Sequence, residues 1–136
     1  MVEMKIVYQG DLRSQATHGP SGTQVITDAP VDNHGKGESF SPTDLVATAL
    51  GSCMMTIMGI VAQRHNLDLR GTTVTVQKEM ATQPVRRIGK LTVNIHVPVE
   101  LGEDDRKRLE QAAYTCPVHK SIHPDVAMPV TFTWGN

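Results

Sequence analysis

Aromatic residues, cysteines and net charge are all scarce in this 136-residue chain, and each shortage excludes a class of protein. Aromatic residues make up only 4% of the chain, so any core must be aliphatic, with thioether contributed by seven methionines. Two cysteines are too few for the disulfide framework of a small secreted domain. The net charge of −1 lacks the basic excess typical of proteins that bind nucleic acids or anionic membranes.

No export signal and no low-complexity linker is visible in the sequence. No basic stretch followed by an apolar one opens the sequence, and 136 residues is the size of one ordinary domain. We therefore expect a single domain over residues 1–136, located in the cytoplasm. We expect no nucleic-acid or membrane partner, and no cofactor or metal.

One long uncharged segment, residues 45–63, favours a buried central helix. Its length would allow a membrane span, but interspersed polar and glycine residues dilute its hydropathy. Ser41 can cap the helix, Pro42 fits the first helical position, and Asp44 completes an approximate capping box. Because the helix is apolar nearly all round, it must be surrounded by protein. Small residues spaced by four, including Gly51 and Gly59, suggest close approach of a second copy.

The remaining pattern predicts an α+β fold. Segments 4–8 and 24–27 have strand character and flank a turn at residues 19–22, which predicts a hairpin. Alternating segments at 72–76 and 91–97 predict a second hairpin. A helix over 103–114 and a strand over 129–134 complete the chain. Strands and helices do not alternate strictly, so we expect the long helix to pack against antiparallel sheets.

The two cysteines occupy different contexts. Cys53 lies in the middle of the apolar helix, where an inert buried thiol is common. Cys116 precedes Pro117, which can begin a short helix ending near residue 122. Cys116 would then either gain a lowered pKa from the helix N-terminus or serve as a structural cap.

A zinc site is a weaker interpretation of the same residues. Cys116, His119 and His123 have metal-like spacing, and Cys53 could be a fourth ligand. Pro124 disfavours helical geometry at His123. We therefore do not expect a metal.

Two segments carry a resemblance to a known family. The first runs from Phe40-Ser41-Pro42-Thr43-Asp44-Leu45 to Ala49-Leu50-Gly51-Ser52-Cys53, and the second is Ala112-Ala113-Tyr114-Thr115-Cys116-Pro117-Val118. In order and placement they resemble the two-cysteine pattern of the osmotically induced protein C / organic hydroperoxide resistance (OsmC/Ohr) family. Chain length and the order of strands and helices fit as well, so the resemblance covers essentially the whole chain.

The resemblance implies a thiol-dependent peroxidase that reduces organic hydroperoxides. Cys53 would be the peroxidatic cysteine and would become a sulfenic acid. Cys116 would be the resolving cysteine and would form a disulfide with it. A dithiol, either a small molecule or a lipoyl protein, would restore both thiols. The family fold implies an intertwined homodimer with the long helices at its centre.

The sequence departs from the family where a cation should face the peroxidatic thiol. In the family an Arg from the N-terminal hairpin stabilises the thiolate and the departing alkoxide, and a Glu after the helix-opening Pro holds it. Arg13 is the nearest candidate for that cation, with Arg86 or Arg87 as alternatives.

The carboxylate that should hold this cation is also displaced. Thr43 follows Pro42, so Asp44 or Glu38 would have to replace the family Glu. An alternative function therefore stays open: a non-catalytic protein on the same fold, with buried thiols, that binds a small apolar ligand between its helices.

Overall fold

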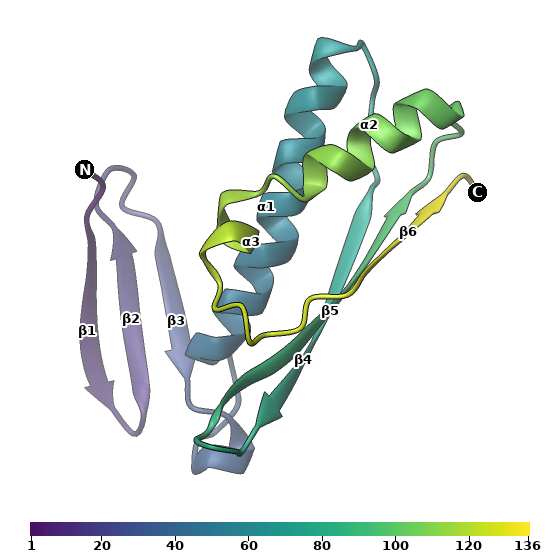
Figure 1. Ribbon diagram of the computed structural model, residues 1–136. Coiled ribbons are helices and arrows are strands. Elements are labelled where there is room, and N and C mark those ends of the chain that lie inside the picture. Colours follow the sequence, from purple (N-terminus) through teal and green to yellow (C-terminus); the bar gives the residue numbers. More distant parts are fainter. The chain divides into compact units, whose positions relative to one another are not determined.

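The computed structural model describes residues 1–136 and confirms the α+β class (Figure 1). The chain divides into two compact units, Met1–Val46 and Ala47–Asn136. The single domain expected over residues 1–136 stays a prediction. The elements are β1 (Met4–Gly10), β2 (Arg13–His18), β3 (Gln24–Asp28), a 3₁₀ turn (Val31–Asn33), α1 (Pro42–Arg64), β4 (Thr73–Ala81), β5 (Arg87–Val97), α2 (Glu103–Ala113), α3 (Pro117–Ser121) and β6 (Val130–Trp134).

The first unit contains an antiparallel sheet in the order β1-β2-β3. The predicted pairing of segments 4–8 and 24–27 is wrong, because β2 lies between them and pairs with both. Sequence patterning missed β2 because its polar residues show no apolar alternation. Asp11 and Leu12 form the β1–β2 loop with positive φ values of 53° and 63°, the backbone that a two-residue hairpin loop requires.

One face of this sheet is apolar and exposed. The register aligns Ile6 with Ala16 and Ala16 with Val25, so all three lie on the same face. Ile6 and Val25 are 61% and 40% exposed, and Tyr8, on the same face, is 67% exposed. The unit therefore leaves its largest apolar side chains uncovered.

Helix α1 begins as the sequence predicted. The Ser41 hydroxyl accepts a hydrogen bond from the Asp44 amide (3.0 Å), and the Asp44 carboxylate accepts one from the Ser41 amide (2.9 Å). This reciprocal pair is a capping box, with Pro42 as the first helical residue.

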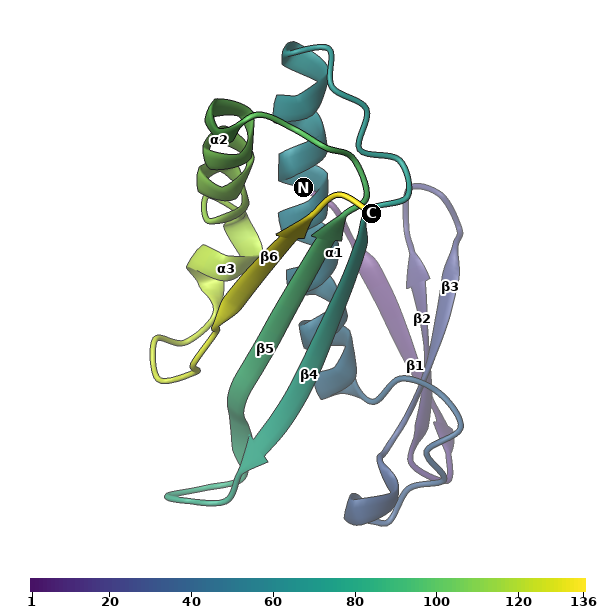
Figure 2. The same cartoon turned by 90° about the vertical axis from the view of Figure 1, so that its right-hand side faces the viewer.

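The second unit contains a mixed sheet in the order β4-β5-β6. The predicted hairpin forms the antiparallel β4–β5 pair, but β6 runs parallel to β5, so the expectation of purely antiparallel sheets is wrong here. A parallel neighbour needs a long crossover connection, and α2 and α3 provide it. Figure 2 shows α1 and α2 on the same side of this sheet.

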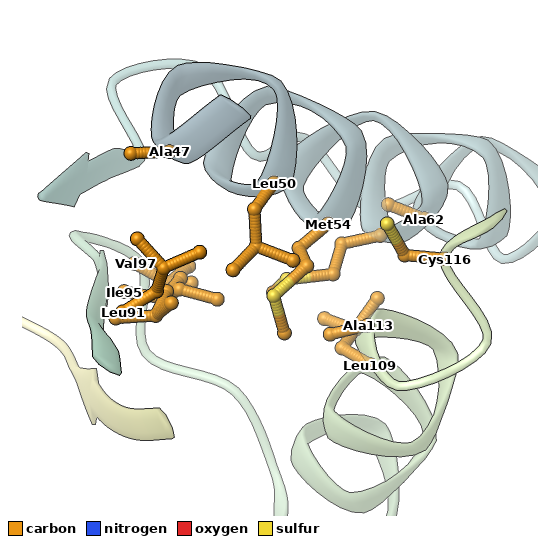
Figure 3. Packing of buried hydrophobic residues seen from close by; sticks show 12 residues of the cluster. Ala47, Leu50, Met54, Ala62, Leu91, Ile95, Val97, Leu109, Ala113 and Cys116 are labelled. Atoms are coloured by element: carbon orange, nitrogen blue, oxygen red, sulfur yellow. The ribbon is translucent and has the colours of Figure 1, made fainter. Parts of the chain in front are cut away.

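The core of the second unit lies between α1, the sheet and α2 (Figure 3). Leu50, Met54 and Met58 are fully buried. They cluster with buried residues of the sheet and of α2: Leu91, Val93, Ile95, Val97, Leu109 and Ala113. Methionine and aliphatic side chains thus fill the core that the shortage of aromatic residues predicted.

Helix α1 is only partly covered within one chain. Val46 and Ile60 are 37% and 42% exposed, so the single chain does not surround the helix completely, and its burial on all sides stays a prediction. By length and composition alone α1 could cross a membrane, with a mean hydropathy of 2.0 in an 18-residue window. The core helix of a soluble protein meets the same criterion.

The two glycines singled out in α1 have different surroundings. A Cβ on Gly51 would lie 2.9 Å from a methyl group of Val76 and 3.1 Å from one of Val74. Gly51 therefore allows α1 to approach β4 of its own chain, and its expected contact with a second copy is wrong. A Cβ on Gly59 would meet nothing within 4 Å, so that position is open.

Candidate active site

Cys116 caps the short helix α3. Its side chain accepts a hydrogen bond from the His119 amide (N···Sγ 3.4 Å), and Pro117 is the first helical residue. The thiol is 0% exposed, and its sulfur is directed toward α1 (Figure 3). The structure therefore confirms the cap and the start of the helix at Pro117.

Cys53 lies on α1 next to the fully buried Met54. It is half-buried against the core cluster, and both cysteines are free thiols. Cys53 is close enough to Cys116 for its side chain to raise the pKa of the Cys116 thiol. The structure thus brings together the two cysteines that lie on different helices and far apart in the sequence.

The pKa of Cys116 lies above its ordinary value. Burial is the largest cause, and the interaction with Cys53 raises this pKa further. The backbone amides of His119 and Val118 act in the opposite direction but do not outweigh burial. The possibility that the helix N-terminus lowers the pKa of Cys116 is therefore wrong.

This pKa has a chemical consequence for the pair. Cys116 keeps its proton at neutral pH, and a negative charge on Cys53 disfavours a second one on Cys116. A thiolate is the reactive form of cysteine, so burial works against reaction at Cys116. Cys53 is the more accessible of the two sulfurs.

Arg13 lies in the first unit, on β2, where Asp28 of β3 holds it. The Arg13 guanidinium donates to both carboxylate oxygens of Asp28, at 2.6 and 2.8 Å. Asp28 is 1% exposed and also accepts a hydrogen bond from the Glu38 amide (3.0 Å). The Glu38 carboxylate lies 3.9 Å from Arg13. Asp28 is therefore the principal partner of this cation.

The ion pair shifts both pKa values in the direction of the charged forms. The hydrogen bond from Arg13 lowers the pKa of Asp28, against the opposing effect of burial, and the same bond raises the pKa of Arg13. Sequence reasoning missed Asp28 and considered Asp44 and Glu38 instead. Asp44 belongs to the capping box of α1, and Glu38 makes only the longer contact.

The alternative cations lie at the β4–β5 hairpin. Arg86 is exposed, and Arg87 donates to the backbone oxygen of Ile88 at 3.1 Å.

The residues with metal-like spacing do not form a cluster that could bind zinc. No group of three or more His, Cys, Asp or Glu side chains is arranged to hold a metal ion. His123 is 70% exposed at its side chain, and its Nδ1 accepts a hydrogen bond from the Asp125 amide (3.0 Å).

A pocket of about 610 Å³ lies at the carboxyl end of α1, a volume typical of small-molecule sites. Its lining residues are Met55, Gly59, Ala62, Gln63, Asn66, Leu67, Asp68, Leu69 and Arg70.

Comparisons with known proteins identify the family. A family model described as OsmC-like protein matches residues 35–131. A structure from Psychrobacter arcticus 273-4, named for osmotic stress induction and a detoxification response, is 51% identical, with a TM-score of 0.92 over 97% of this chain and 96% of that chain.

Two more distant structures share the fold. An organic hydroperoxide resistance protein OsmC from Legionella pneumophila is 15% identical, with a TM-score of 0.78 over 98% of this chain and 96% of that chain. An organic hydroperoxide resistance protein from Elizabethkingia anophelis is 14% identical, with a TM-score of 0.78 over 100% of this chain and 96% of that chain. No curated protein sequence matches the chain. The family match and the 51% identical structure show that the chain belongs to the OsmC-like protein family.

Proposed function

We propose that this protein reduces organic hydroperoxides through Cys53 and Cys116. The observation that carries the proposal is the proximity of a half-buried Cys53 to a fully buried Cys116 whose pKa it raises. Organic hydroperoxide resistance proteins with the same fold support the assignment.

The chemistry proceeds in three balanced steps. The Cys53 thiolate attacks the outer oxygen of the hydroperoxide, which leaves a sulfenic acid on Cys53 and releases an alkoxide that takes up a proton to become an alcohol. Cys116 then attacks the Cys53 sulfur, and a disulfide and one water form. Two thiol–disulfide exchange steps with a dithiol, either a small molecule or a lipoyl protein, restore both thiols.

We assign to Arg13 the stabilisation of the negative charge that develops on the leaving oxygen. Its guanidinium is held in one orientation by the two hydrogen bonds to Asp28. Its raised pKa keeps it charged. Asp28 would then perform the orienting role that the resemblance gives to a Glu.

We further propose that the protein acts as a homodimer in the cytoplasm. The exposed apolar face of β1–β3 and the exposed residues of α1 supply surface for a second copy. A cycle that must regain two free thiols fits a reducing compartment.

The test is treatment of the reduced protein with one equivalent of cumene hydroperoxide, followed by tryptic mass spectrometry without reductant. We expect an intramolecular Cys53–Cys116 disulfide and one equivalent of cumyl alcohol. C53S should abolish both products, and C116S should still release alcohol but leave Cys53 as a sulfenic acid that dimedone traps. Two free thiols after treatment of the unmodified protein would refute the proposal.

One observation favours the alternative function, a protein that binds a small apolar ligand. The pocket of about 610 Å³ includes Met55, Leu67 and Leu69. If the thiols stay unchanged in the test above while apolar compounds protect the protein against thermal unfolding, and M55E removes that protection, the binding function replaces the peroxidase.

A further inference from the structure

His119 is joined to the thiol pair but has no role in the steps above. Its backbone amide donates to the Cys116 sulfur at 3.4 Å. Its side-chain Nδ1 is buried and has no hydrogen-bond partner. A buried polar atom without a partner destabilises the folded state, so its presence in a native protein needs an explanation, of which a catalytic role is one.

The imidazole is held next to the Cys116 turn by aromatic packing. Its ring meets the Tyr114 ring edge-on, with centroids 5.9 Å apart and an interplanar angle of 85°. Tyr114 in turn packs against Phe132 of β6, with centroids 6.2 Å apart. Tyr114 and His119 therefore lie on either side of Cys116 in the sequence and contact each other in space.

The resolving step needs a group that accepts a proton at this place. Cys116 is protonated because burial and Cys53 raise its pKa, yet only its thiolate attacks sulfur efficiently. Cys53 cannot accept the proton, because its sulfur is the atom under attack. Lys120 and Tyr114 are both exposed, whereas the Nδ1 atom of His119 is buried beside the Cys116 turn.

We propose that the His119 imidazole, whose buried Nδ1 makes no hydrogen bond in the resting state, moves onto the Cys116 thiol and accepts its proton when Cys116 attacks Cys53. During turnover, Cys53–SOH and Cys116–SH give the disulfide and one water: the thiol proton passes to the imidazole and then to the departing hydroxide. This role in turnover rests on the proposed function. The same proton transfer serves attack on any leaving group carried by Cys53, which allows a test without peroxide.

Ellman's reagent, 5,5′-dithiobis(2-nitrobenzoic acid), provides that test. The reduced protein receives one equivalent, which places a thionitrobenzoate on Cys53. Attack by Cys116 forms the Cys53–Cys116 disulfide and releases a second thionitrobenzoate, whose absorbance gives the closure rate. C116S should release only the first equivalent.

We expect H119Q to slow closure about 10-fold or more near pH 7, within the usual effect of a general base. The rate difference between H119Q and the unmodified protein should narrow as the pH rises, because more Cys116 then ionises without help. H119N is a second variant of different size, and H123Q is the matched control, because His123 is exposed in the same segment and should leave closure unchanged.

A purely structural role of His119 predicts a rate loss that is independent of pH. Closure in H119Q and H119N at the rate of the unmodified protein, or a loss that persists at high pH, would overturn the proposal. The peroxide reaction is measured separately on the same samples. If cumene hydroperoxide oxidises nothing while closure still depends on His119, the peroxidase function fails and the role of His119 stands.

Discussion

Each unit of the chain contains a three-stranded sheet, but the two units bury different kinds of side chain. Every fully buried apolar side chain belongs to Ala47–Asn136, where Leu50, Met54 and Ile95 fill the space between helix and sheet. In Met1–Val46 the buried residues are Thr27, Asp28 and Ser41, all polar.

This difference shows that the units are stabilised by different forces. Burial of apolar surface is the dominant favourable term in folding, and the second unit buries its apolar side chains in a core of its own. The first unit is held by strand pairing, by the Arg13–Asp28 ion pair and by the Ser14–Thr27 hydrogen bond (2.6 Å). A three-stranded sheet needs a hydrophobic face packed against something, so the apolar face of β1–β3 requires cover that the unit itself does not provide.

The largest expected effect separates the two glycines of α1. G51L should destabilise the protein by about 1–3 kcal/mol or more, because even a Cβ would lie 2.9 Å from Val76 and extra atoms in a packed core force side chains and backbone to shift. G59L places the same side chain on the same helix in open space and should leave the free energy of unfolding nearly unchanged. Denaturant unfolding of both variants measures the difference. Equal losses would mean that space at Gly51 does not limit the packing of α1 against β4.

A smaller effect is expected on the exposed face of the first unit. I6S removes an apolar side chain that is 61% exposed in the single chain. If a second copy covers that face, I6S should weaken association by about 1–2 kcal/mol, since roughly 25 cal/mol is lost per Å² of apolar surface. Sedimentation equilibrium measures the association.

The control for that measurement is V85S, because Val85 is 63% exposed and lies in the β4–β5 connection outside the apolar face. It should leave association unchanged. A monomeric protein without any substitution would contradict the homodimer itself.

The sequence predicted elements whose signals are local. Ser41, Pro42 and Asp44 specify the start of α1 within four residues, and Cys116-Pro117 does the same for α3. The strand β2 was missed because its mostly polar sequence shows no alternation of apolar and polar residues. Only its pairing with β1 and β3 makes it a strand.

The site was predictable only in part, for the same reason. The contact between Cys53 and Cys116 joins distant segments, and only the family resemblance indicated it. Asp28 was missed as the partner of Arg13 because the β2–β3 register places the two opposite each other, and that register depends on the unrecognised strand. A single missed strand thus concealed the ion pair.

The smallest expected effect concerns this ion pair and its dependence on pH. Arg13 lowers the pKa of Asp28 in the folded protein, so the pair contributes stability at pH values above the unfolded pKa of about 3.9. That stability is lost as the pH falls through the lower, folded pKa. D28N cannot ionise, so it should be less stable than the unmodified protein near neutral pH. The difference between the two should shrink as the pH falls below about 4. Urea unfolding across this range measures the difference in the free energy of unfolding.

E38Q is the matched control, because Glu38 is 62% exposed at its side chain and 3.9 Å from Arg13, where an ion pair contributes little. A difference between D28N and the unmodified protein that does not change with pH would show that Asp28 acts through the packing of its buried side chain. The ionic contacts would then not be the force that stabilises the first unit.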